Sequence, residues 1–317
     1  MERVKDMWED AVTTDFLGVE VYTFGLYAAM GMALALIALG LLMKRARWPK
    51  GSAALTGVLA VGCGFIVSRL FFCFMDQGLG GPVPLRGVLL VTGGGYSMMG
   101  ALLGACIGAI GAAKILKRPP AALLDLLSPA LMLFAACERL GERCIDDFGI
   151  SRPLVSDLLK GSFLAIEGDY DWVLATCLLE AFAALILALV LLRDVNKKDR
   201  RDGNTLILFL LLFGASQVIL ESLRFDQHMH LSFVGLQQII ALLMLCAGVA
   251  VVAFRRMRDK RGMAIWALAL LPIAAAVGVG LEFAIDRTTV NRFLLYAVFI
   301  LVMAAPAALG VRLRKEG

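Results

Sequence analysis

Ionisable side chains interrupt several long apolar stretches of this sequence, and they are the first residues to examine for chemistry. Five of them lie toward one end of their stretches: Arg69, Arg139, Glu180, Glu221 and Arg224. A charge inside a bilayer is costly and marks a functional site by default. Because a guanidinium group binds phosphate through two parallel hydrogen bonds, the set predicts a shared polar cavity, with one net positive charge, for an anionic phospholipid headgroup.

A purely structural interpretation of these charges stays open. An arginine near the end of a membrane span can extend its charged group to the lipid headgroups. Glu221 and Arg224 are three residues apart, so they can pair on one helical face. Asp125 differs from the five, because it lies near the opposite end of its stretch. The only two histidines, His228 and His230, lack an evident third metal ligand, so we expect no metal and no cofactor.

The apolar stretches that carry these charges have the length of membrane-spanning helices. Of the 317 residues, 60% are hydrophobic and 18% are charged, which is far more apolar surface than a soluble domain needs. About 20 apolar residues in a helix cross the hydrocarbon core. We therefore expect an all-α polytopic membrane protein, with spans at residues 22–43, 52–75, 88–116, 121–140, 173–193, 205–223, 233–254, 263–282 and 293–311.

Lys and Arg residues are distributed unevenly between the connecting segments. Alternate segments carry 20 of the 31 Lys and Arg residues, namely 44–50, 114–120, 193–203, 255–262 and the tail after 311. Segments rich in positive charge stay in the cytoplasm. The sequence thus predicts an outer N-terminus and a cytoplasmic C-terminus. It also predicts a small outer head segment over residues 142–172, and the five charges near the outer interface.

The third span has an unusual beginning. Three glycines, at positions 93 to 95, precede Tyr96 and Ser97. Irregular backbone at membrane depth is tolerated only where it is buried in protein or lines a polar cavity, so we expect the helix to begin near Ser97. Glycines that recur at four-residue spacing let two helices approach closely. This spacing predicts close packing at Gly100, Gly104 and Gly108.

Several segments, taken in order, resemble the prolipoprotein diacylglyceryl transferases. The similar segments are SRLFFCF with Arg69, GGGYSMMGALLG, ERLGERCIDDFG with Arg139 and Gly141, ESLRFD with Glu221 and Arg224, and GLQQIIALLM with Gln238. The resemblance covers roughly residues 18–256. It implies an outer N-terminal segment (1–21), a seven-helix transferase-like membrane core (22–256), and a C-terminal extension with two further spans (257–317).

The resemblance also implies an activity and its participants. Such an enzyme transfers a diacylglyceryl group from phosphatidylglycerol to the lipobox cysteine thiol of a prolipoprotein. It works without a cofactor or nucleic acid, at the outer face of the bacterial inner (cytoplasmic) membrane. The resemblance implies catalytic roles for Arg139 and Glu221. It implies substrate binding by Arg69, Arg139, Arg224, Tyr96, Ser97 and Gln238.

Several positions depart from the family pattern. The third-span histidine, a first-span tyrosine, the signature asparagine and an arginine before Glu221 are replaced by Met99, Phe24, Glu142 and Gln217, and the signature glycine by Glu138. A thiol with a pKa of about 8.5 is only slightly ionised at neutral pH, so a base would help. The base is left open among Glu142, Asp147 and His228. The alternative is a non-catalytic relative that binds an anionic phospholipid or a lipidated partner.

Overall fold

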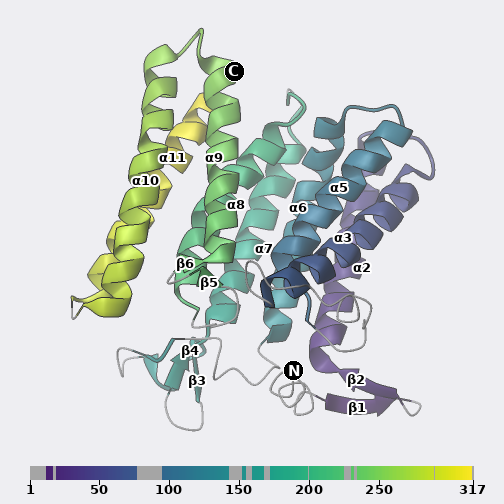
Figure 1. Ribbon diagram of the computed structural model, residues 1–317. Coiled ribbons are helices and arrows are strands. Elements are labelled where there is room, and N and C mark those ends of the chain that lie inside the picture. The colour runs from purple at the N-terminus through teal and green to yellow at the C-terminus, as the bar shows by residue number, and fades with distance from the viewer. Residues whose placement is uncertain are drawn as a thin grey trace. The chain divides into compact units, whose positions relative to one another are not determined.

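The computed structural model describes residues 12–16, 19–76, 95–142, 152–154, 159–167, 172–198, 200–224, 230–231, 234–288 and 290–315. Within these ranges, nine helices are long and apolar enough to cross a membrane (Figure 1). They are α2 (Thr23–Arg45), α3 (Ser52–Asp76), α5 (Met98–Ile115), α6 (Pro120–Glu142), α7 (Thr176–Val195), α8 (Asn204–Ser222), α9 (Leu236–Arg256), α10 (Arg261–Arg287) and α11 (Arg292–Lys315). The predicted all-α polytopic architecture is confirmed.

Short strands flank some of the helices. Three antiparallel pairs occur in the described ranges: β1 (Val12–Phe16) with β2 (Val19–Tyr22), β3 (Ala165–Glu167) with β4 (Trp172–Leu174), and β5 (His230–Leu231) with β6 (Val234–Gly235). Strand β3 lies within the segment 142–172 where the sequence predicted a small head, and β4 begins at the last residue of that segment.

The helices form two compact units. The first unit comprises Met1–Gly149 and Cys177–Gly203, and it holds α2, α3, α5, α6 and nearly all of α7. The second unit comprises Ile150–Thr176 and Asn204–Gly317, and it holds β3, β4 and everything from α8 to α11. The domain boundaries after residues 21 and 256 stay predictions.

Helix α5 begins where the sequence predicted and packs closely against α3. Ser97 caps it, because its hydroxyl accepts a hydrogen bond from the Gly100 backbone N–H at 3.3 Å. A Cβ atom at Gly104 would lie 2.3 Å from the Cys63 carbonyl oxygen, and one at Gly108 would lie 2.2 Å from that of Leu59. The close packing predicted from the glycine spacing is therefore confirmed.

Asp125 has a structural role near the start of α6. Its side chain is fully buried and pairs with the Arg200 guanidinium, and it accepts a hydrogen bond from the Gly203 backbone N–H at 2.7 Å. A buried carboxylate with these two partners has the compensation that burial of a charge demands. Asp125 thus anchors the segment that follows α7, apart from the charges predicted to form the site.

Candidate functional site

Arg139 lies near the end of α6 among three carboxylates of the first unit. Arg139 is 3% exposed, and its Nε lies 2.9 Å from Glu180 Oε2 and 3.6 Å from Glu138 Oε2. Its Nη1 donates a hydrogen bond to Glu142 Oε1. The structure thus brings Arg139 and Glu180 together as the sequence placed them. The group around Arg139 is rich in acidic side chains, because three carboxylates surround one guanidinium.

Arg69, near the end of α3, holds the backbone that enters α5. Its Nη1 donates to the Gly95 carbonyl oxygen at 2.8 Å, and its guanidinium carbon lies 5.6 Å from the centre of the Tyr96 ring. Gly95 has a φ of +78°, and a Cβ there would lie 2.3 Å from the Phe72 ring. The glycine is therefore required at this turn, which fixes Tyr96 and Ser97 before the helix.

Tyr96 is the titratable group at this turn. Burial raises the pKa of its phenol, and the nearby Arg69 charge partly offsets this effect. The phenol therefore keeps its proton at neutral pH, and it can donate a hydrogen bond to a ligand.

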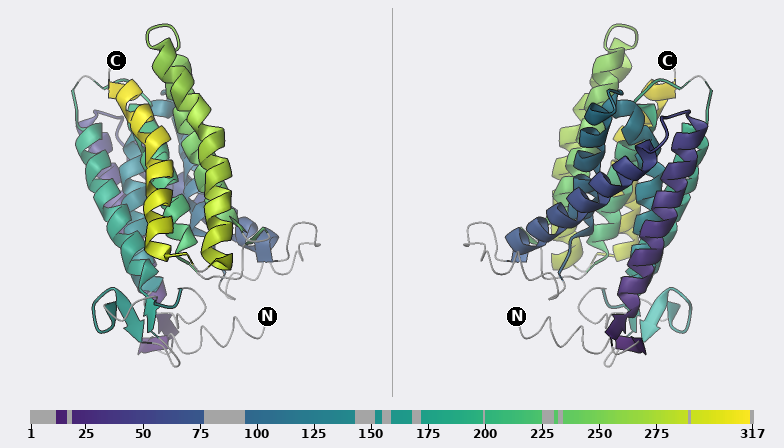
Figure 2. Two further views of the ribbon diagram at one scale, coloured as in Figure 1. Left: turned by 90° about the vertical axis from the view of Figure 1, so that its left-hand side faces the viewer. Right: turned by 90° about the vertical axis from the view of Figure 1, so that its right-hand side faces the viewer.

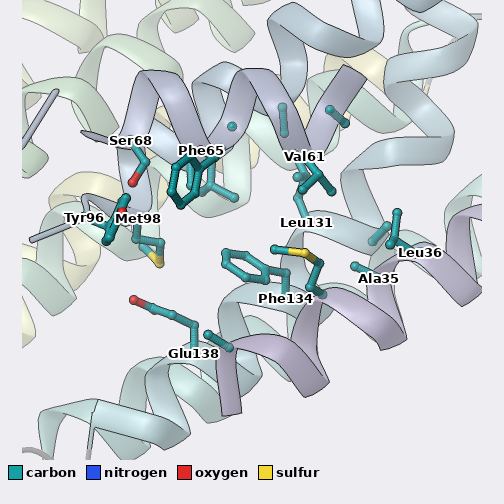
Figure 3. Close-up of a pocket in the computed structure, with 18 of the residues that line it drawn as sticks. Ala35, Leu36, Val61, Phe65, Ser68, Tyr96, Met98, Leu131, Phe134 and Glu138 are labelled. Carbon is teal, nitrogen blue, oxygen red and sulfur yellow. The ribbon is translucent and has the colours of Figure 1, made fainter. Parts of the chain in front are cut away.

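A cavity of about 420 Å³ lies in the first unit, lined by α2, α3, the beginning of α5, and α6 (Figure 3). Most of its lining is apolar, with Leu36, Val61, Phe65, Leu131 and Phe134 among the side chains. Its polar lining residues are Ser68, Tyr96, Ser97 and Glu138. These four gather near the end at which α2 and α5 begin and α3 and α6 finish. The cavity thus combines an apolar body with one polar end.

Glu138 lines the cavity but was not among the site residues predicted from the sequence. Its carboxylate points into the cavity, toward the side where Ser68 and Tyr96 lie (Figure 3). Leu131 and Phe134 line the same cavity and precede Glu138 by seven and four residues, a spacing that places all three on one helical face. That spacing was the signal in the sequence that could have indicated the direction of Glu138. In the sequence, Glu138 stood out only as a departure from the family pattern.

The position where the family has a histidine is packed rather than open. Met99 is 1% exposed, and it is not among the described residues that line the cavity. Phe24, which stands at the place of a family tyrosine, does line the cavity. Of the two positions at which the resemblance predicts a lost polar group, Phe24 lines the cavity and Met99 does not, and Glu138 brings a carboxylate to the same cavity.

A second cluster of polar side chains lies in the second unit. Glu221, Arg224 and Gln238 are all buried, and they line a cavity of only about 10 Å³ with four further residues: Arg152, Ser222, Gly235 and Glu282. Gln217 Nε2 lies 3.5 Å from Glu221 Oε2. This space is about the size of one water molecule, so the group is nearly closed.

The predicted site residues thus fall into two sets. Arg69, Tyr96, Ser97, Arg139 and Glu142 belong to the first unit, whereas Glu221, Arg224 and Gln238 belong to the second. The idea that the five charges named in the sequence analysis share one cavity stays a prediction. Asp147 and His228 lie outside the described residues. In the described part of the chain, no three His, Cys, Asp or Glu side chains are grouped as metal ligands.

The apolar helices define a multi-pass membrane protein, and comparison with known families gives its class. The family model described as prolipoprotein diacylglyceryl transferase matches residues 11–254. The chain therefore belongs to the prolipoprotein diacylglyceryl transferase family, a family of transferases. The match ends before α10 and α11, so these two helices lie beyond the family region.

Individual relatives agree with this assignment at low identity. A protein of Staphylococcus haemolyticus is 25% identical over 202 residues, which cover 62% of this chain and 70% of the relative. A Staphylococcus carnosus protein is 23% identical over 78% of this chain and 91% of its own length. A Bacillus licheniformis protein is 23% identical over 64% of this chain and 76% of its own length. All three are named phosphatidylglycerol–prolipoprotein diacylglyceryl transferase.

Proposed function

We propose that this protein transfers a diacylglyceryl group from phosphatidylglycerol to the lipobox cysteine thiol of a prolipoprotein, at the outer face of the membrane. The observation that carries the proposal is the cavity of the first unit, with its apolar body and a polar end beside Arg69 and Arg139. Acyl chains would occupy the apolar body, and the glycerol phosphate would lie at the polar end. The basic loops described above support an outer position for that end.

The arginines would act on the phosphate. Arg69 lies over the ring of Tyr96, a cavity residue, so its charge is close to the polar end. Arg139 shares its guanidinium with three carboxylates, and one of these, Glu138, lines the cavity. Positive charge fixed beside the departing phosphate oxygen stabilises the charge that develops there during the reaction.

Glu138 would act as the base. In the proposed reaction the Glu138 carboxylate accepts the thiol proton, and the sulfur forms a bond to the glycerol carbon. The bond between that carbon and the phosphate oxygen breaks, and its electron pair leaves with glycerol phosphate. Arg139, whose Nε lies 3.6 Å from Glu138 Oε2, compensates the charge of the carboxylate before the transfer. A base in reach of the reacting proton is the first requirement of general base catalysis.

The test uses the full-length protein in vesicles of labelled phosphatidylglycerol, with a peptide that carries a lipobox cysteine. The wild type should form a diacylglyceryl thioether. Glu138→Gln should lower kcat by about 100-fold or more, within the range expected for a lost base, while phosphatidylglycerol binding persists. Glu142→Gln, one turn further along α6, is the matched variant and should have a smaller effect.

Two outcomes would change the assignment. If the wild type binds phosphatidylglycerol but forms no thioether, the chain is the non-catalytic relative, an alternative that the buried Met99 favours. If Glu142→Gln lowers kcat more than Glu138→Gln does, Glu142 is the base. In that case the role of Glu138 in proton transfer is wrong.

A further inference from the structure

Helices α10 and α11 lie beyond the family match, yet they bring polar side chains to the residues of the second unit that the family resemblance selects. They pack beside α8 and α9 (Figures 1 and 2). Glu282 and Asp286, one turn apart, stand on α10, and Tyr296 stands on α11. Glu282 is only 4% exposed. An acidic side chain buried in a span needs specific partners, so its contacts indicate its purpose.

Glu282 holds the amide of Gln238. Gln238 Nε2 lies 2.5 Å from Glu282 Oε1 and 3.3 Å from the Val218 carbonyl oxygen of α8. Gln238 Oε1 accepts a hydrogen bond from the Gly235 backbone N–H at 2.9 Å. Because the oxygen takes a backbone N–H, the amide nitrogen must face the carboxylate. One glutamine thus joins α8, the beginning of α9, and α10.

The end of α8 has further contacts with the extension. Arg152 bridges Asp286 Oδ1 and the Ser222 carbonyl oxygen, each at 2.8 Å. The Tyr296 hydroxyl donates to the same carbonyl oxygen at 3.1 Å. Ser222 directly follows Glu221 and stands two residues before Arg224. The extension therefore holds the backbone that carries the predicted Glu221–Arg224 pair.

We propose that α10 and α11 brace the Glu221–Arg224 region, and that Glu282 is a positioning residue that acts on this pair through Gln238. Glu221, Arg224, Gln238 and Glu282 line the same small cavity, so little space separates the brace from the pair. The inference deepens the proposed function and rests on it. It assigns the helices beyond the family region a part in the transfer reaction.

The test measures transfer by full-length variants in phosphatidylglycerol vesicles. Glu282→Ala should lower kcat about 10- to 100-fold and leave KM for phosphatidylglycerol within about threefold, because the lost contact orients a group rather than binding the lipid. Glu282→Gln keeps an oxygen that accepts from Gln238, so it should recover activity to within about fivefold of the wild type. If the two residues act as a pair, the double variant with Gln238→Ala should be no worse than the poorer single variant.

Leu281→Ala is the matched control, because it removes a neighbouring buried side chain of α10 without touching the polar contacts. It should lower Tm but keep kcat per folded molecule within about twofold. If Glu282→Ala resembles this control in kcat, or if its effect adds fully to that of Gln238→Ala, the positioning role is wrong.

A separate binding measurement distinguishes failure of the brace from failure of the proposed function. If the wild type binds phosphatidylglycerol in nanodiscs but forms no thioether, the transferase proposal fails. Glu282→Ala should then speed hydrogen exchange of the backbone at the end of α8 about tenfold relative to Leu281→Ala, because it removes the contact that holds Gln238 to α10. Equal exchange in the two variants would overturn the brace. A wild type that neither binds nor transfers overturns both proposals.

Discussion

The polar groups of the two units use similar residues in very different surroundings. In the first unit, Glu138 and Tyr96 reach into a cavity of about 420 Å³ with an apolar lining. In the second unit, Gln238 and Glu282 bond to each other beside a space of about 10 Å³. The larger cavity has room for part of a lipid, and the smaller one for about one water molecule. The difference in size supports the two proposals, that buried charge serves ligand binding in the first unit and bracing in the second.

Removal of Arg139 should have the largest effect on this comparison. Arg139→Ala leaves Glu138, Glu142 and Glu180 close together without their cation. We expect kcat for thioether formation to fall about 100- to 1,000-fold, as for other lost electrostatic groups. Arg139→Lys keeps the charge but loses some of the contacts with the three carboxylates, so its kcat should lie between those of the wild type and Arg139→Ala. Retained activity of Arg139→Ala would remove Arg139 from the mechanism.

Arg152→Ala tests the bracing role of the second unit. The change removes the donor to the Ser222 carbonyl oxygen and the partner of Asp286. We expect the free energy of unfolding to fall by about 1–3 kcal/mol, the usual cost of polar groups that lose their partner. Thermal unfolding in detergent measures this, with Arg152→Lys as the control that keeps the charge. An unchanged Tm would show that the second unit does not depend on this brace.

Arg69→Ala should act mainly on lipid binding. The arginine lies over Tyr96 at the polar end of the cavity, so its loss removes positive charge from the proposed phosphate position. We expect KM for phosphatidylglycerol to rise about tenfold, equivalent to about 1.4 kcal/mol. Arg69→Lys should lose less. If kcat falls and KM does not change, Arg69 acts in the chemical step instead.

Tyr96→Phe should have the smallest effect. The ring that lies under Arg69 remains, and only the hydroxyl is lost. Since burial raises the pKa of Tyr96, the hydroxyl stays protonated at neutral pH, and it contributes a neutral hydrogen bond rather than a charged one. We expect a loss in kcat/KM of about threefold to tenfold, close to the net value of such a bond. A loss of 100-fold or more would place Tyr96 in proton transfer.

The sequence predicted the helices better than it predicted which faces they present. All nine spans follow from the lengths of the apolar stretches, and the beginning of α5 follows from its glycines and Ser97. Lipid and protein interior are both apolar, however, so an apolar helix such as α5 has no polar face that marks its orientation. The burial of Met99 in α5 therefore became evident only in three dimensions, whereas the spacing of Glu138 from Leu131 and Phe134 was a signal that the sequence contained.

The sequence predicted only part of the surroundings of Arg139 and none of the contacts of the extension. Glu138 and Glu142 flank Arg139 closely in sequence, but the approach of Glu180 depends on how α7 packs. The contact between Gln238 and Glu282 joins residues 44 positions apart, in helices that the family pattern does not relate. Neither spacing nor composition encodes such a contact.

The glycines of the first unit also determine how its cavity can change size. Helix α5 touches the backbone of α3 at Gly104 and Gly108. Helix α2 also packs closely on α6, where a Cβ at Gly31 would lie 2.7 Å from Cys137 Cβ. Contacts this tight allow little sliding or tilting within either pair. We therefore expect the α3–α5 pair to move as one rigid body and the α2–α6 pair as another. If a lipid enters sideways from the bilayer between these two pairs, we expect the pairs to separate as whole bodies, and the speed of that separation would set an upper limit on turnover.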